Sequence, residues 1–179
     1  MKTKTVLLWA ISLFVLDQIV KIVINQHFLD VRFDIIPPFF YFRPKQSQSY
    51  SYVNHLFNLG MGFWVHAIIR CFITILIVVL YDLLKTISEN AKIINIAFIF
   101  AFAAILCSLI DTFLWGGSLD FIYLKPLFIF DLKDLYINVF VILFLLYYIK
   151  NRKHLSSFKN KVVINHYKNR FRGGNKNDL

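Results

Sequence analysis

Three aspartates stand in one of the most apolar parts of the chain. Asp120, Asp131 and Asp134 fall within FLWGGSLDFIYLKPLFIFDLKDLYINVF, residues 113–140, although a carboxylate beside lipid is costly. Two aspartates that share a water can hydrolyse a peptide bond: one ionised carboxylate takes a proton from the water, and the other, kept protonated, donates to the carbonyl oxygen. Such a pair titrates as a unit and needs no metal or other cofactor. Carboxylates could alternatively carry protons or cations in a transporter.

Two simpler roles are open for these charges and their neighbours. An aspartate just before a helix accepts hydrogen bonds from free backbone N–H groups, so Asp131 and Asp134 could be helix caps. Asp17 and Lys21 are four residues apart, which puts them on one helix face, where they could form a structural ion pair. Caps explain one carboxylate at a time, but they do not explain carboxylates that reach one depth from separate segments.

The composition places these charges in a membrane protein. Apolar residues make up 58% of the chain, aromatic residues 18%, and the mean hydropathy is +0.61, well above a soluble domain. A helix needs about 20 mostly apolar residues to cross a bilayer. The fourth apolar run is short, so its helix must begin at or before Asp134, thin the bilayer, or use Tyr147 and Tyr148 as interfacial anchors. The predicted fold is an all-α bundle of four transmembrane helices, at about residues 5–24, 64–84, 93–114 and 134–149.

Basic residues set the expected orientation. Lysines and arginines concentrate at the N-terminus, in the turn KTISENAK at 85–92 and in the C-terminal tail, and such segments stay on the cytoplasmic side. Both termini are therefore expected inside, with residues 1–150 as the membrane domain and 151–179 as a basic cytoplasmic tail. The net charge of +10 suits contact with anionic lipid head groups, so nucleic-acid binding is not expected.

Two segments are expected on the outer face. Residues 25–63 contain IIPPFFYFRP, whose prolines interrupt helix and favour extended backbone, and many aromatic rings that suit the bilayer interface. We expect a small extended or β platform there, resting on the outer leaflet. Residues 115–133 are expected as an outer loop that carries Asp120.

Polar groups from four predicted segments reach the outer half of the bundle. The inner half contains almost none apart from Asp82. A transporter needs a polar path across the whole bilayer, so it is the weakest alternative. The outer polar residues are Asp17, Lys21, Ser108, Asp111, Thr112, Asp120, Asp134 and Asn138.

Metal and cofactor chemistry are not expected. The five histidines form no HExxH or comparable cluster. Cys71 and Cys107 fall inside predicted spans at a spacing that matches no metal site, so we interpret them as apolar packing residues. No Ser-centred elbow, phosphate loop or dinucleotide fingerprint occurs in the chain.

Four short boxes occur in order along the chain: LDQIVK, FNLGMGF, LIDTFLWGGSLDF and FDLKDLYI. They resemble the boxes of the lipoprotein signal peptidases of bacteria (signal peptidase II), which are membrane aspartyl peptidases. LDQIVK in the first helix is similar to the family's DQxxK, and FNLGMGF at 57–63 is similar to its NxGxxF box. LIDTFLWGGSLDF at 109–121 resembles GNLIDR followed by VVDF, and FDLKDLYI at 130–137 resembles FNxADxxI. Each box is weak alone, but the order and depth of all four match over about residues 6–149.

The resemblance implies the roles of individual residues. It places the catalytic pair at Asp120 and Asp134, with substrate-binding or supporting residues at Asp17, Lys21, Asn58, Gly60, Ser108, Asp111 and Asp131. It implies removal of the signal peptide of prolipoproteins before a cysteine that bears a diacylglyceryl group, with the aromatic outer segment as a cradle for the lipidated substrate. The expected location is the bacterial cytoplasmic (inner) membrane, with the site at the outer leaflet, membrane lipids as neighbours and the chain a monomer.

The chain departs from the family's pattern near the expected site. Cys107 and Ser108 stand in place of Gly-Asn before LID, and Thr112 stands in place of the arginine that follows it. Asp131 and Lys133 replace Asn and Ala before the second catalytic aspartate. The missing arginine removes a donor that could hold a carboxylate or carbonyl. We expect a divergent active peptidase, and the alternative is a non-catalytic relative that binds lipidated peptides at the membrane.

Overall fold

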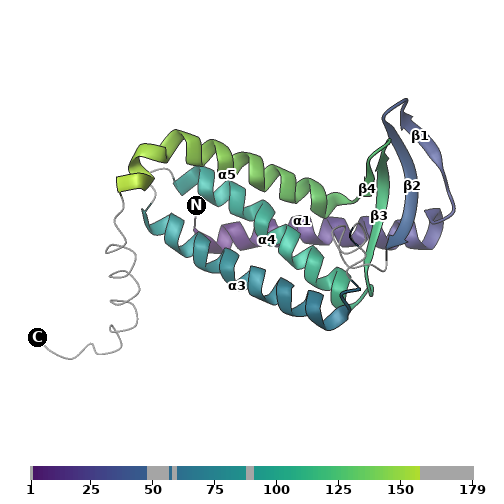
Figure 1. The fold of residues 1–179 in the computed structure, drawn as a ribbon, viewed down its shortest axis with the longest axis horizontal. Helices are drawn as coiled ribbons and strands as arrows, with labels where there is room; N and C mark the ends of the chain where they lie inside the picture. The colour runs from purple at the N-terminus through teal and green to yellow at the C-terminus, as the bar shows by residue number, and fades with distance from the viewer. Residues whose placement is uncertain (1, 48–56, 58–59, 88–90, 158–179) are drawn as a thin grey trace, which may run out of the picture.

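The computed structural model describes residues 2–47, 57, 60–87 and 91–157 as a helical bundle with a small sheet at one end. The helices are α1 (Thr3–Val23), α3 (Phe63–Ile87), α4 (Ala91–Phe113) and α5 (Leu132–Ser157). Figure 1 shows that α1 and α4 run toward the sheet, whereas α3 and α5 run away from it. We call the two ends of the bundle the sheet end and the far end.

All four helices are long and apolar enough to cross a membrane. The candidate spans are Thr3–Phe28, Phe63–Thr86, Lys92–Phe113 and Leu132–Arg152. The last helix begins at Leu132, ahead of Asp134, and continues to Ser157, so it needs no local thinning of the bilayer to cross. The predicted fold class, a four-helix membrane bundle with a small β platform, is confirmed.

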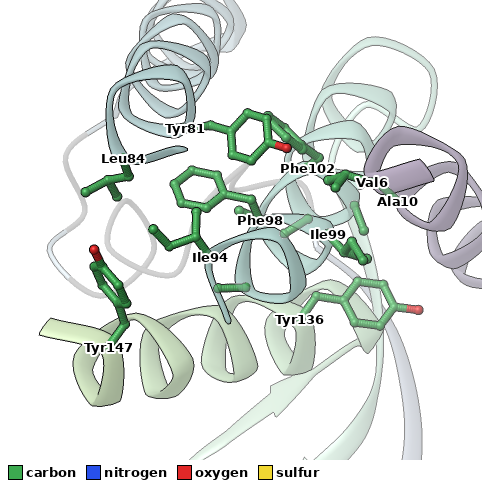
Figure 2. Close-up of a cluster of buried hydrophobic side chains, with 14 of the residues drawn as sticks. Val6, Ala10, Tyr81, Leu84, Ile94, Phe98, Ile99, Phe102, Tyr136 and Tyr147 are labelled. Atoms are coloured by element: carbon green, nitrogen blue, oxygen red, sulfur yellow. The ribbon is translucent and has the colours of Figure 1, made fainter. Parts of the chain in front are cut away.

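The central helix of the bundle is α4. Of its most apolar stretch, 56% is buried inside the protein, against 11–22% for the other three spans. Phe98 of α4 packs against Tyr81 of α3 and Phe140 of α5, with ring centroids 5.1 and 5.4 Å apart, and Figure 2 shows Phe98 beside Tyr81 and Ile94. The other helices leave many large apolar side chains exposed, as helices that face lipid do.

The sheet has four antiparallel strands in the order β1-β2-β3-β4. β1 (Phe33–Ile36) and β2 (Phe40–Ser47) come from the expected platform, whereas β3 (Ser118–Leu124) and β4 (Phe128–Phe130) come from residues 115–133. The expectation of a loop at 115–133 is therefore wrong. The physical reason is visible in SLDF at 118–121, where polar and apolar side chains alternate, so that one face packs while the backbone pairs with β2.

Apolar contacts fix β3 to the bundle. Leu119 and Phe121 are buried and pack with Ile24, the first residue of a π-helical turn, η1 (Ile24–Phe28), that follows α1. Ser118 and Asp120 alternate with these two residues along the strand and therefore share the other face. Packing of one face of β3 thus determines where the polar face lies.

The family-like box at residues 57–63 is described only in part. Asn58 lies outside the described residues. Gly60 has φ +63°, a left-handed backbone conformation that favours glycine. Its role as a substrate-binding residue stays a prediction.

Candidate active site

The predicted site residues of four segments meet at the sheet end of the bundle. Hydrogen bonds and ion pairs join them to two further residues, Ser118 and Lys133. We call the whole group the charged cluster. It consists of Asp17 and Lys21 of α1, Asp111 of α4, Ser118 and Asp120 of β3, Asp131 just before α5, and Lys133 and Asp134 of α5.

Lys21 joins α1 to α4 and to the start of α5. Its Nζ lies 3.1 Å from Asp17, 2.8 Å from Asp111 and 2.7 Å from Asp131, and none of these four side chains is exposed. A buried charge is costly unless it is paired, so this shared ammonium is the main compensation for three buried carboxylates. Asp17 and Lys21 do form the predicted structural pair, but the pair extends to two other segments.

Asp131 and Asp134 form a reciprocal cap at the start of α5. The backbone N–H of Asp134 donates to Asp131 Oδ1 at 3.2 Å, and the backbone N–H of Asp131 donates to Asp134 Oδ2 at 3.2 Å. This is the pattern of a capping box, in which the residue before a helix and the third helical residue satisfy each other's N–H. The cap interpretation is therefore correct for both aspartates. The cap also holds the Asp134 carboxylate beside the rest of the charged cluster.

Ser118 and Lys133 lie at the centre of the charged cluster. Ser118 Oγ lies 2.8 Å from Asp120, 3.2 Å from Asp131 and 3.3 Å from Asp111, and Lys133 Nζ donates to this hydroxyl at 2.5 Å. A serine has one hydroxyl proton, so it donates to one carboxylate at a time, and Asp120 is the nearest. Ser118 therefore links Asp120 to the cation.

The sequence held a signal for only one of these two residues. Ser118 precedes Asp120 by two positions in a strand, which places both on one face. Lys133 stands in the first turn of α5, where the helix dipole disfavours a cation. Its position is explained by the surrounding carboxylates, which come from segments far apart in the chain, and the spacing within its own box does not reveal them.

Asp120 and Asp134 are the two aspartates of the charged cluster whose side chains are partly exposed at the protein surface. The side chain of Asp120 is 20% exposed and Asp134 is partly exposed, whereas Asp17, Asp111 and Asp131 are fully buried. A carboxylate oxygen of Asp120 lies within 4.8 Å of one of Asp134. Because a water makes hydrogen bonds of about 2.8 Å, one water can contact both carboxylates.

Asp120 and Asp134, together with Asp131, are spaced closely enough to bind a hard metal cation. Oxygen atoms of Asp120, Asp131 and Asp134 lie within 4.8 Å of one another, and carboxylates suit such cations. The ammonium of Lys133, however, lies 2.5 Å from Asp131 and 3.7 Å from Asp120. The protein's own cation thus stands at this position, and we infer no metal site here.

Burial and charge act differently on the two aspartates that lie outside the spans. Burial raises the pKa of Asp120, the Lys133 ammonium only partly offsets this, and Asp131 adds to it. Burial acts in the same sense on Asp131, but the ammonium groups of Lys133 and Lys21 outweigh it and hold the pKa of Asp131 below its usual range. Asp131 is therefore a fixed negative charge, whereas Asp120 holds a proton more tightly than an ordinary aspartate. Acid–base chemistry uses such differences between neighbouring carboxyl groups.

The remaining predicted residue of α4, Ser108, takes part through its backbone. Its carbonyl oxygen accepts hydrogen bonds from Arg70 Nη1 at 2.9 Å and from Thr112 Oγ1 at 3.0 Å. Arg70 of α3 also interacts electrostatically with Asp111. A guanidinium group from the neighbouring helix therefore stands near the position where Thr112 lacks one. Asn138, in contrast, is exposed on α5.

Comparison with solved structures agrees with this fold. One bacterial membrane enzyme, determined by the in meso method at 2.3 Å resolution, is 21% identical, with a TM-score of 0.65 over 87% of this chain and 94% of that chain. A second, determined by the same method at 1.9 Å resolution, is 24% identical, with a TM-score of 0.63 over 83% of this chain and 94% of that chain. At these identities the similarity establishes the fold alone.

Comparison of the sequence with protein families is more specific. No curated protein matches the chain in sequence. Residues 9–150 match the profile of the family described as Signal peptidase (SPase) II, or Peptidase_A8. This match includes most of α1 and α5, the whole of α3 and α4, the sheet and the whole charged cluster. The chain therefore belongs to the signal peptidase II family of aspartic peptidases, which cleave the signal peptides of prolipoproteins.

Proposed function

We propose that this chain is a membrane aspartic endopeptidase that cuts diacylglyceryl-modified prolipoproteins before the lipidated cysteine, with Asp120 and Asp134 as the catalytic pair. Residues 1–150 are the proposed peptidase domain, and 151–179 the proposed basic tail. One observation carries the proposal. Two partly exposed carboxylates lie within 4.8 Å of each other at the edge of a charged cluster whose other aspartates are fully buried.

The proposed reaction needs one carboxylate and one carboxylic acid. The ionised member of the pair takes a proton from a water, and the water oxygen forms a bond to the scissile carbonyl carbon. The protonated member donates its proton to the carbonyl oxygen. When the C–N bond breaks, the member that took the water's proton gives it to the leaving amine, and the other member takes back a proton from a hydroxyl of the intermediate, which becomes the new carboxyl group. Asp120 and Asp134 titrate as one unit in this scheme, and the proton count closes without a metal or another cofactor.

The buried members of the charged cluster position this pair. Asp131 caps α5 and thereby orients Asp134. Lys21 pairs with Asp17, Asp111 and Asp131 and so fixes α1, α4 and the start of α5 to one another. Asn58, Gly60 and Ser108 stay predicted substrate-binding or supporting residues on the strength of the family pattern.

The proposed placement has the sheet end at the outer leaflet of the bacterial cytoplasmic membrane and both termini in the cytoplasm. Basic residues near span ends favour the cytoplasmic side. The far end carries Lys2, Lys4, Lys85, Lys92, Lys150 and Arg152. The sheet, with exposed aromatic side chains at Phe33, Phe39 and Phe128, would then meet the bilayer interface and cradle the diacylglyceryl group of the substrate. We propose that the enzyme acts as a monomer among membrane lipids.

One observation favours a second function. The ammonium of Lys133 lies 3.7 Å from Asp120, and a cation this close favours the ionised form of a carboxyl group. If both members of the pair were ionised, neither could donate a proton to the substrate carbonyl. Such a chain would bind lipidated peptides without cutting them.

Cleavage of a defined substrate distinguishes the two functions. The purified protein in lipid or detergent is incubated with a diacylglyceryl-modified prolipoprotein and with the same chain lacking the lipid, and mass spectrometry identifies the products. We expect a new N-terminus at the lipidated cysteine and much slower cutting of the unmodified chain. Equal cutting of both would contradict the proposed specificity, and binding without cutting would support the second function.

Replacing Ser118 with alanine tests the contact that links Asp120 to Lys133. The change removes one hydroxyl from a buried network, so we expect a loss of about 1 kcal/mol of stability. It also frees Asp120 to move, and we expect cleavage to slow by roughly tenfold or more. Ser12→Ala is the matched control, because Ser12 is exposed on α1 and donates its hydroxyl proton to the Leu8 carbonyl of its own helix. Equal rates for the two variants would show that Ser118 does not orient Asp120.

A further inference from the structure

The ammonium of Lys133 occupies an unusual place for a residue in the first turn of a helix. Its Nζ lies 2.5 Å from Asp131, 3.1 Å from Asp111 and 3.7 Å from Asp120. It also donates to Ser118 Oγ, and its side chain is only 10% exposed. Lys133 thus turns inward, away from the water that a lysine at a helix end normally seeks.

Two of these contacts duplicate what Lys21 already provides. Lys21 Nζ lies 2.8 Å from Asp111 and 2.7 Å from Asp131, so neither of those carboxylates depends on Lys133 for a partner. Asp120 does depend on it. Within the described part of the chain, Lys133 is the cation that forms an ion pair with Asp120.

The structure assigns to Lys133 a role in the reaction. We propose that Lys133 is a positioning residue that sets the ionisation of the Asp120–Asp134 pair, and that Asp131 holds the ammonium of Lys133 in place. The inference rests on the proposed function, because it assumes that the pair performs acid–base catalysis. It concerns two positions at which the chain has Asp and Lys where the family's pattern has Asn and Ala.

Several charged groups act on Asp120 besides Lys133. Burial and Asp131 favour its protonated form, while Lys133, the Ser118 hydroxyl and Lys21 favour its ionised form. Lys45 of β2 is its cross-strand partner in the sheet register. The charged cluster contains more acidic than basic groups, so the loss of its nearest cation would disfavour the ionised form of Asp120. The other polar and charged groups of the charged cluster are Asp17, Lys21, Asp111, Ser118, Asp131, Lys133 and Asp134, with Lys45 on the neighbouring strand and Arg70 of α3 acting on Asp111.

A neutral residue of similar length at position 133 tests this role. In Lys133→Met the pair loses its nearest cation, so both limbs of the pH profile of kcat/KM should move to higher pH, by roughly one unit or more. kcat at neutral pH should fall while KM changes little, since Lys133 is not proposed to bind substrate. Lys133→Arg keeps a positive charge and should keep the wild-type profile. Lys92→Met, at the far end of α4, is the control for loss of a lysine.

The double variant Asp131→Asn/Lys133→Ala separates charge from structure. It removes one negative and one positive charge near Asp120, so the two electrostatic effects oppose each other, and the profile should return toward that of wild type. If Lys133→Met alone fails to fold, the pH profile of this double variant still tests the role of Lys133.

The outcomes distinguish a failure of the inference about Lys133 from a failure of the proposed function. If wild type cuts, and Lys133→Met lowers the rate without moving either limb, then Lys133 is merely structural and this inference is wrong, while the proposed function stands. If the double variant shifts as far as Lys133→Met, Asp131 and Lys133 do not act as a pair, and the inference is again overturned. A wild-type protein that cuts no lipidated substrate overturns the proposed function and this inference with it.

Discussion

Asp120→Asn and Asp134→Asn are each expected to abolish cleavage while the protein stays folded. An amide can neither take a proton from water nor donate a carboxyl proton, so each change removes one of the two steps of the proposed reaction, worth roughly 10²–10⁴-fold in rate. The amide oxygen can still accept a hydrogen bond. It can therefore replace the Asp120 acceptor for Ser118 and the Asp134 acceptor for the Asp131 N–H. Initial rates with a diacylglyceryl-modified prolipoprotein, together with thermal unfolding, measure both expectations.

Asp82→Asn supplies the control for these two variants. Asp82 is partly buried on α3, near the far end of the bundle, and the same change there should leave the rate unaltered. Binding of the lipidated substrate should persist in Asp120→Asn and Asp134→Asn, because the sheet is unchanged. A variant at 120 or 134 that retains a tenth or more of the wild-type rate would exclude that residue from the acid–base pair.

Most of the bundle can be predicted from composition, because crossing a bilayer leaves few solutions for the backbone. Every N–H and C=O must be satisfied within the membrane, so each long apolar run must be a helix. The depth of Asp17, Lys21 and Asp111 then follows from the helix direction. The boxes of the family pattern add Asp120 and Asp134, and the structure brings these five residues into one charged cluster.

The sheet and the inner members of the charged cluster were harder to predict. β3 and β4 form because β2, distant in the chain, offers a pairing edge, and such non-local pairing leaves only a weak alternating pattern in the sequence. Lys133 is harder still. Its own helix turn predicts exposure, and only the sum of charges from α1, α4 and β3 makes the buried position favourable. A network built from separate segments has no local period that the sequence could reveal.

Lys21→Met is expected to cause the largest loss of stability among the variants described. Three fully buried carboxylates lie within 3.1 Å of the Lys21 ammonium, and methionine fills the same space without charge. Lys133 still contacts Asp111 and Asp131, whereas the contacts that Asp17 keeps within the described residues are with uncharged donors, the Gln18 amide at 3.0 Å and the Cys107 thiol. Breaking a buried pair by removing one partner costs about 3–5 kcal/mol. Thermal unfolding in detergent, with Lys92→Met as the control, should show a large fall in Tm for Lys21→Met alone.

The pH dependence of Tm tests whether this loss is electrostatic. Lys21 and Lys133 hold the pKa of Asp131 below its usual range in the folded protein. Asp131 therefore stabilises wild type above the pKa of an unfolded aspartate, about 3.9, and this contribution disappears as pH falls through the lower folded value.

In Lys21→Met the depression of the Asp131 pKa is smaller, and protonation relieves the carboxylates left without a cation. The difference in Tm between wild type and variant should therefore shrink as pH falls toward and below about 4. Adding Asp17→Asn to Lys21→Met should recover part of the stability at neutral pH, because Asp111 and Asp131 still pair with Lys133 and Asp17 is the carboxylate that loses its ion-pair partner. A Tm difference that is constant with pH, and that Asp17→Asn does not reduce, would mean that Lys21 stabilises the bundle by packing of its alkyl chain, so that the helices of the active site would not depend on its charge.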